Sequence, residues 1–329
     1  MRIKVWQPIP ILVLLTSALA PAQAQQAKER LFINADRSIR AVSFSPDGKT
    51  LASCGDEGVK LWDPSDGKEK AFLERVKDWH WALAYAPNGV VLAVAEGRLV
   101  RLLDPGTLKE KSVLKGHPSS VYGLAFSLDG KRLAVCGGSG PGGGRISVFD
   151  LAAARIQTSM KTDGEARHVA FSPDGKMLVS GGGGNVSEVR LWNPSNGEEL
   201  KTLKGPTGQV QGVTFATDGK TFIVGTWRSD EGGEVKLWNV AHGKEEAFLK
   251  GSVSGGGRLA LANDGKTLAA VARGYAVLLW DLKSRKEITI YEHPRNVSAL
   301  VFSPDGKTLA TGDGNGSIRL WDVPLARSK

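Results

Sequence analysis

Short runs in which apolar and polar residues alternate fill this chain from residue 28 onward. The run Val59-Lys60-Leu61 shows the pattern, which is typical of β-strands with one buried face. Between runs, turns such as Pro46-Asp47-Gly48 combine a proline that presets φ with a glycine that accepts a positive φ. The first cycle of this pattern predicts four strands, at residues 39–44, 50–54, 59–62 and 69–73.

The same cycle returns seven times along the chain. An aromatic or apolar residue precedes each turn, and these residues follow one another at intervals of 41 to 46: Phe44, Tyr85, Phe126, Phe171, Phe215, Leu261 and Phe302. An interval of about 40–45 residues is expected for a four-stranded propeller blade. One blade buries too little apolar surface to be stable alone, whereas neighbours stacked in a ring share a core. We therefore predict an all-β fold, a seven-bladed β-propeller.

A second motif lies in the third strand of most cycles. It reads Leu-Trp-Asp or Leu-Trp-Asn at residues 61–63, 191–193, 237–239, 279–281 and 320–322, with weaker copies at 102–104 and 148–150. With the turns, and with Gly116-His117, this motif resembles the WD-repeat β-propeller family. The resemblance implies an interaction module without catalytic activity or cofactor. It also implies buried hydrogen bonds among a histidine, a serine or threonine, the tryptophan and an acidic residue; here His293, Thr311 and Trp321 are present, with Asn315 at the acidic position.

The N-terminal part of the repeat region lacks a blade of its own. Residues 28–34 contain Leu31-Phe32-Ile33, a strand pattern, and only six residues follow Val323 in the last cycle. The simplest closure lets residues 28–34 supply the fourth strand of blade seven, which removes an open sheet edge.

Residues 1–24 have a different pattern from the repeats. Arg2 and Lys4 precede the apolar stretch 11–20, and Ala22-Gln23-Ala24 follows. A basic start, a short apolar middle and an A-x-A site predict a signal peptide. We expect cleavage after Ala24, with Ala20 as the alternative, leaving residues 25–329 as a single propeller that is periplasmic or extracellular. The apolar stretch is shorter than the roughly 20 residues of a membrane span, so we expect no stable membrane insertion after cleavage.

The formal net charge of +9 falls to about +7 once Arg2 and Lys4 are removed. The remaining lysines lie singly in turns without a block of five like charges, so we expect no nucleic-acid partner. Cys54 and Cys136 end equivalent strands two blades apart, too far for a disulfide, and we predict two unbridged buried thiols. We also expect a monomer.

Catalytic and metal-binding motifs are missing from the sequence. It contains no H-E-x-x-H, C-x-x-C or G-x-S-x-G pattern. The rival hypothesis is a small-ligand-binding or hydrolytic propeller with its site in the channel mouth, for which Glu165 and His168, near Arg167, are the only candidates.

The leading hypothesis is a scaffold that binds a protein or peptide partner. In the WD-repeat family, the position four residues before the conserved aromatic often contacts bound peptides. Tyrosine, tryptophan and arginine are enriched at binding hot spots, and the long loops of repeats three to five at residues 137–144, 181–187 and 226–233 are expected on the same face. The predicted partner-binding residues are Arg40, Trp79, Trp81, Tyr122, Arg167, Gln211, Trp227 and Arg228. The alternative is that Trp81 and Tyr122 merely plug the channel.

Overall fold

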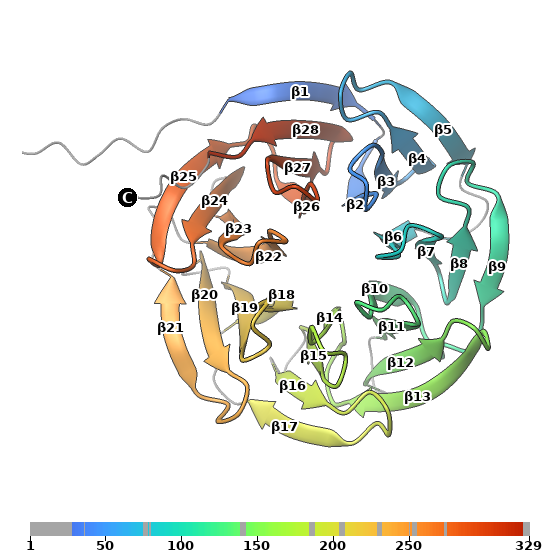
Figure 1. Ribbon diagram of the computed structural model, residues 1–329, viewed down its shortest axis with the longest axis vertical. Coiled ribbons are helices and arrows are strands. Elements are labelled where there is room, and N and C mark those ends of the chain that lie inside the picture. Colours follow the sequence, from blue (N-terminus) through green and yellow to red (C-terminus); the bar gives the residue numbers. More distant parts are fainter. Residues whose placement is uncertain are drawn as a thin grey trace, which may run out of the picture.

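The computed structural model describes residues 28–35, 37–74, 78, 80–138, 143–183, 188–203, 208–228, 232–249, 251, 255–272 and 275–324. Every element within these residues is a β-strand, and the strands form seven four-stranded antiparallel sheets arranged as a ring (Figure 1). The predicted seven-bladed propeller is confirmed. The part of the chain that the structure describes contains no helix long and apolar enough to cross a lipid bilayer.

The first strand of each blade lies at the centre of the ring. From blade one to blade seven these innermost strands are β2 (Ile39–Phe44), β6 (His80–Tyr85), β10 (Val121–Phe126), β14 (His168–Phe171), β18 (Gln209–Phe215), β22 (Gly255–Leu261) and β26 (Val297–Phe302). Each contacts the innermost strands of both neighbouring blades, so the seven surround the axis of the ring (Figure 1). Residues from all seven line a hollow there, which we call the central channel. We call the end of the ring where these strands begin the upper rim, and the end where they turn into the second strands the lower mouth.

The other strands of each blade follow outward in sequence order. The second strands are β3 (Leu51–Gly55), β7 (Leu92–Glu96), β11 (Arg132–Gly137), β15 (Leu178–Gly181), β19 (Thr221–Arg228), β23 (Thr267–Ala272) and β27 (Thr308–Asp313). The third strands are β4 (Gly58–Trp62), β8 (Leu99–Leu103), β12 (Gly144–Asp150), β16 (Val189–Trp192), β20 (Gly232–Asn239), β24 (Ala276–Asp281) and β28 (Ser317–Asp322). The outermost strands are β5 (Glu69–Glu74), β9 (Glu110–Leu114), β13 (Arg155–Thr162), β17 (Glu199–Leu203), β21 (Glu245–Leu249), β25 (Lys286–Glu292) and, for blade seven, β1 (Glu29–Asn34).

The N-terminal strand closes the ring as predicted. β1 pairs antiparallel with β28, with Ile33 opposite Ile318 and Leu31 opposite Leu320 (Figure 1). The Ile33 side chain is 5% exposed and packs in the core between blades seven and one, whereas Phe32 points the other way and is 48% exposed. The last blade is therefore completed by the segment farthest from it in sequence.

The hydrophobic core is divided among the blade interfaces. The described residues form seven clusters of buried side chains, each made of residues from two adjacent blades. Cys54 and Cys136 lie in two different clusters as buried thiols outside any disulfide, as predicted, and burial raises the pKa of the Cys136 thiol. Stability thus depends on every blade touching both of its neighbours.

Buried indole N–H groups donate to side-chain hydroxyls in blades one, four and seven. Trp62 Nε1 donates to Ser53 Oγ at 2.8 Å, and Trp192 Nε1 donates to Ser180 Oγ at 2.8 Å. In blade five, Trp238 pairs with Phe222 in the ladder, and the position two residues later, where blades one, four and seven carry the hydroxyl, is Val224. Trp238 Nε1 is consequently buried without an acceptor among the described residues.

Blade seven contains the fullest version of the buried network. Thr311 Oγ1 accepts from Trp321 Nε1 at 2.9 Å and also contacts His293 Nε2 at 2.9 Å. The sequence count placed Asn315 at the acidic position, but the buried carboxylate belongs to Asp313, which accepts from the backbone N–H of Asn315 and of Ser317 at 2.9 and 3.0 Å. Burial lowers the pKa of His293 to about 4, so its imidazole is neutral at pH 7.

Replacing Ile33 by alanine should destabilise the whole propeller. Removing a buried isoleucine side chain costs about 2–5 kcal/mol, and here the loss falls on the interface that joins the two ends of the ring. Urea unfolding measures the change. Phe32→Ala is the matched control on the exposed face of the same strand, where the ring contacts Arg319, and it should cost less than about 1 kcal/mol. Equal losses for both variants would show that β1 does not close the ring.

Val224→Thr should stabilise the protein. The two side chains have similar shape, and the new hydroxyl would give the Trp238 N–H an acceptor, worth about 1 kcal/mol. Ser180→Ala creates the same orphaned N–H in blade four and should cost about 1–3 kcal/mol. Thermal melts of both variants measure the effect. A lower melting temperature for Val224→Thr would refute the assignment of position 224 as the missing acceptor.

Candidate functional site

The innermost strands share an irregularity near the upper rim. In four blades the ladder to the second strand skips one residue, which therefore has no partner opposite it: Arg40, Tyr122, Gln211 and Ser298. In blade two, both Trp81 and Ala82 fall in the irregularity between His80 and Leu83. A β-bulge of this kind bends the strand and re-aims the extra side chain. In blades one, two, three and five the irregularity therefore includes a residue predicted from the sequence as a partner contact, whereas Ser298 of blade seven was not among those residues.

Three of the predicted residues meet at one central cavity. Tyr122, Arg167 and Gln211, from blades three, four and five, line a hollow of about 190 Å³ together with residues of β2, β6, β22 and β26. Small or apolar residues such as Ala41, Gly123 and Ala299 form most of its wall. The structure thus brings three of the eight predicted residues together at this arc of the ring.

Arg167 is held in place on two sides. Its Nε donates to Glu165 at 2.6 Å, and its guanidinium lies 5.7 Å from the centre of the Tyr122 ring. The two terminal nitrogens, Nη1 and Nη2, donate to no residue that the structure describes. They stay available to a ligand while the Nε contact and the tyrosine ring fix the plane of the group.

The remaining predicted residues lie elsewhere or outside the described residues. Arg40 forms an ion pair with Asp56 at 2.9 Å and does not line the cavity. Trp79 lies outside the described residues, as do the side chains of Trp81 and Arg228. The predicted patch of rim tryptophans therefore stays a prediction.

The predicted loop at residues 226–233 is a longer hairpin. β19 runs on to Arg228 and β20 begins at Gly232, with Thr226 opposite Glu234 and Trp227 opposite Gly233. The prediction of a loop was wrong because Thr226 and Trp227, a β-branched and an aromatic residue, favour continued pairing. Trp227 also pairs with Gln209 on β18, which keeps its half-buried side chain on the extended hairpin of blade five.

The sequence analysis missed Arg258, which also lines the cavity. A fixed count of four residues before Leu261 selects Gly257, but the ladder irregularity in blade six spans Gly255 to Leu259 and leaves Arg258 unpaired. The sequence does mark Arg258, but at the position one residue after the one that was counted. The residue three before the conserved aromatic is small in five blades, namely Ala41, Ala82, Gly123, Gly212 and Ala299, and large and basic only at His168 and Arg258.

Positive charge dominates the electrostatics of the cavity. His168, half-buried in the wall, has its pKa lowered to about 3, first by burial and then by the charges of Arg258 and Arg167. Desolvation by the channel walls also lowers the pKa of Arg258, although its side chain remains accessible to solvent in the channel, and the guanidinium stays charged at neutral pH. No aspartate or glutamate is among the described residues that line the cavity. The described residues also contain no group of three His, Cys, Asp or Glu side chains arranged for a metal ion.

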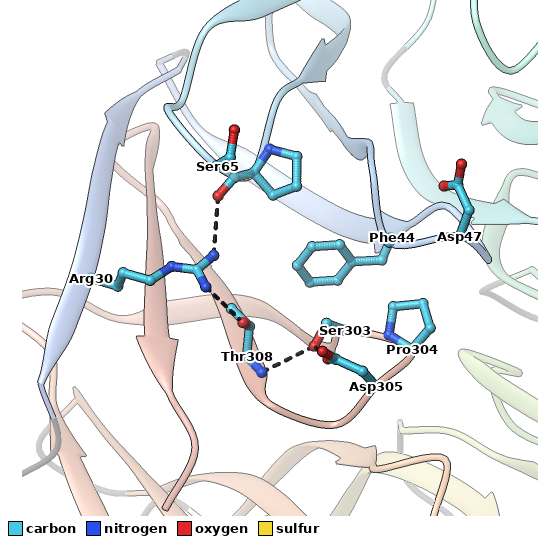
Figure 2. A pocket seen from close by; sticks show the side chains of 10 residues that line it. Arg30, Phe44, Asp47, Ser65, Ser303, Pro304, Asp305 and Thr308 are labelled. Carbon is cyan, nitrogen blue, oxygen red and sulfur yellow. Dashed lines mark hydrogen bonds between the residues drawn. The ribbon is translucent and has the colours of Figure 1, made fainter.

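Two larger hollows lie away from the upper rim. One of about 760 Å³ opens at the lower mouth between the phenylalanines and prolines of the turns. The other, about 480 Å³, lies at the seam between blades seven and one (Figure 2). There Arg30 donates to Pro64 O at 3.0 Å and to Thr308 Oγ1 at 3.2 Å, so its guanidinium holds the closing strand against both blades (Figure 2).

Comparisons with known proteins match parts of the ring. The family model for the WD domain, G-beta repeat, matches residues 29–63 and 285–322, and a model for eukaryotic translation initiation factor eIF2A matches residues 104–245. The uncharacterized WD repeat-containing protein sll1491 of Synechocystis sp. is 37% identical over 71 residues, which is 22% of this chain and 20% of that protein. The probable serine/threonine-protein kinase PkwA of Thermomonospora curvata is 42% identical over 62 residues, 19% of this chain and 8% of that protein.

These curated relatives are thus matched over a fifth of their length or less. The two WD-domain matches cover β1 to β4 and β25 to β28, which include all strands of blade seven and three strands of blade one. The sequence matches and the seven-bladed ring together support a WD-repeat propeller for this chain.

Proposed function

We propose that this protein is an exported, non-enzymatic scaffold that binds a protein or peptide partner at its upper rim and channel mouth. WD-repeat propellers commonly serve as protein-interaction scaffolds. The observation that carries the proposal for this chain is the convergence of Tyr122, Arg167 and Gln211 on one cavity at the end of three adjacent innermost strands. We further propose a monomer without a nucleic-acid partner.

The three side chains supply complementary kinds of contact. Tyrosine gives rigid, amphipathic contact area, and arginine donates paired hydrogen bonds to carboxylates or carbonyls. Gln211 Nε2 donates a hydrogen bond to Gln209 Oε1 on the same strand at 3.3 Å, and the Gln211 amide can also hydrogen-bond to a peptide backbone. A rigid ring that presents such groups needs little reordering on binding, which favours affinity.

The rival enzymatic hypothesis is less well supported by the cavity. Glu165 is engaged by Arg167, and the low pKa of His168 removes it as a general acid at neutral pH. The volume of about 190 Å³ is below the roughly 300–1,000 Å³ of typical sites for drug-sized ligands. These features favour insertion of a side chain over binding of a substrate or cofactor.

Peptide selection tests the binding proposal. A random peptide library displayed on phage, panned on the immobilised chain, should yield binders whose affinity falls at least about tenfold on Tyr122→Ala/Arg167→Ala, a loss of about 1.4 kcal/mol. Leu128→Ala is the control, since it removes a side chain that is 68% exposed at the lower mouth. Melting temperatures confirm that both variants fold. An unenriched library, or selected peptides that bind the double variant as well as the wild type, would contradict the proposal.

Export is a separate expectation that rests on residues 1–24. Expression of the full chain with a C-terminal tag should give a shortened product in the periplasm or medium. Its first residue should be Gln25 after cleavage at Ala24, or Pro21 after cleavage at Ala20. N-terminal sequencing of each cell fraction measures this. A product that keeps residues 2–24 and stays with the cytoplasm would refute export.

A further inference from the structure

The channel wall is built to leave space around two basic side chains. At the position three before the conserved aromatic, five blades carry alanine or glycine, while blades four and six carry His168 and Arg258. Gly212 of blade five lies between them, and a Cβ there would come within 3.0 Å of the backbone nitrogen of Leu259. A larger residue in blade five would therefore press on the strand that carries Arg258.

Arg258 has no counter-charge in the described part of the chain. Its side chain is exposed to the channel, and no ion pair or hydrogen bond joins it to a described carboxylate. Two other arginines near the rim are paired: Arg40 contacts Asp56, and Arg167 contacts Glu165. A guanidinium without a counter-charge inside a protein-walled channel attracts anions, because the walls focus its electrostatic field.

The charges of the cavity favour a particular class of anion. Arg167 and Arg258 contribute +2, Glu165 beside Arg167 contributes −1, and His168 is neutral because of its low pKa, which leaves +1. A singly charged carboxylate matches this balance, whereas a doubly charged phosphate exceeds it. The cavity of about 190 Å³ has room for one side chain or a chain end.

We propose that Arg258 and the free nitrogens of Arg167 form a carboxylate-binding site in the channel, which takes an acidic side chain or the C-terminal carboxylate of the bound peptide. Two guanidiniums donate along the lone pairs of the two carboxylate oxygens. The amide of Gln211 lies on the same wall as a further neutral donor. The site deepens the proposed peptide-binding function and rests on it for the source of the carboxylate.

Small carboxylates test the site directly. N-acetyl-glutamate α-amide presents only a side-chain carboxylate, N-acetyl-alanine presents only a chain-end carboxylate, and inorganic phosphate presents neither. Each is titrated at low ionic strength, because salt screens the attraction. Calorimetry measures affinity, and NMR follows the ring signals of His168, which lies beside both arginines in the cavity wall. One or both carboxylates should bind, shift the His168 signals and outcompete phosphate.

Charge-removing variants assign the binding to the channel. Arg258→Gln and Arg167→Gln should each weaken carboxylate binding at least about tenfold, or about 1.4 kcal/mol. Lys131→Gln removes one positive charge from an exposed turn at the lower mouth and should leave binding unchanged. Equal binding by wild type and Arg258→Gln, tighter binding of phosphate, or no binding of either carboxylate would overturn the site.

Two outcomes distinguish the carboxylate site from the scaffold function. If library peptides bind the wild type and Arg258→Gln equally well, the scaffold function is supported and the carboxylate site is refuted. If the small carboxylates bind but the library yields no peptide, the carboxylate site is supported and a peptide as the source of the carboxylate is refuted. The two acetylated probes then separate a side-chain carboxylate from a chain end.

Discussion

Every blade of this propeller depends on both of its neighbours, and the ring therefore depends on the one interface that closes it. The hydrophobic core consists of seven clusters, each shared between two adjacent sheets. Six of these interfaces lie between blades that are consecutive in the chain. The seventh requires β1 to pair with β28, with Ile33 and Leu31 packed into the joint core. Without that pairing, blades one and seven would each expose an apolar face.

Closure also determines what the channel can bind. Because the seven innermost strands hold one another in place, a side chain displaced by a bulge projects from a wall that cannot adjust. Tyr122 and Gln211 lie on such bulges, and Arg167 immediately precedes the strand between them. The rim therefore presents groups from separate blades in fixed relation, which is the arrangement that preorganised binding requires.

The fold could be predicted nearly completely from the sequence, because seven copies of one pattern all indicate the same arrangement of strands. Strand order, blade count and the closing role of residues 28–34 followed from spacing and from the unpaired strand at Leu31-Phe32-Ile33. The predictions were wrong at positions where one blade departs from the repeat pattern. The hairpin of blade five is longer than the turn pattern implies, and in blade seven the buried carboxylate is Asp313, two residues before the expected acidic position.

The site could be predicted only in part, for a related reason. Counting four residues back from the aromatic found Tyr122 and Gln211, whose blades share the one-residue bulge, and Arg167, which directly precedes β14. It missed Arg258 because a fixed offset cannot register the longer irregularity between Gly255 and Leu259. A comparison of residue size across the blades, in place of matching each blade to a motif, would have revealed the position.

Specificity in a repeated fold resides where its repeats differ. Residues shared by most blades, such as the turn glycines and the buried tryptophans, satisfy the geometry of the ring and cannot distinguish one partner from another. In the channel the largest difference among blades is two basic side chains among five small ones, placed in blades four and six on either side of a glycine. No described carboxylate neutralises the positive charge of Arg258, and most of the cavity wall around it consists of small residues. This charge gives the propeller a preference for a carboxylate ligand that the repeat alone does not encode.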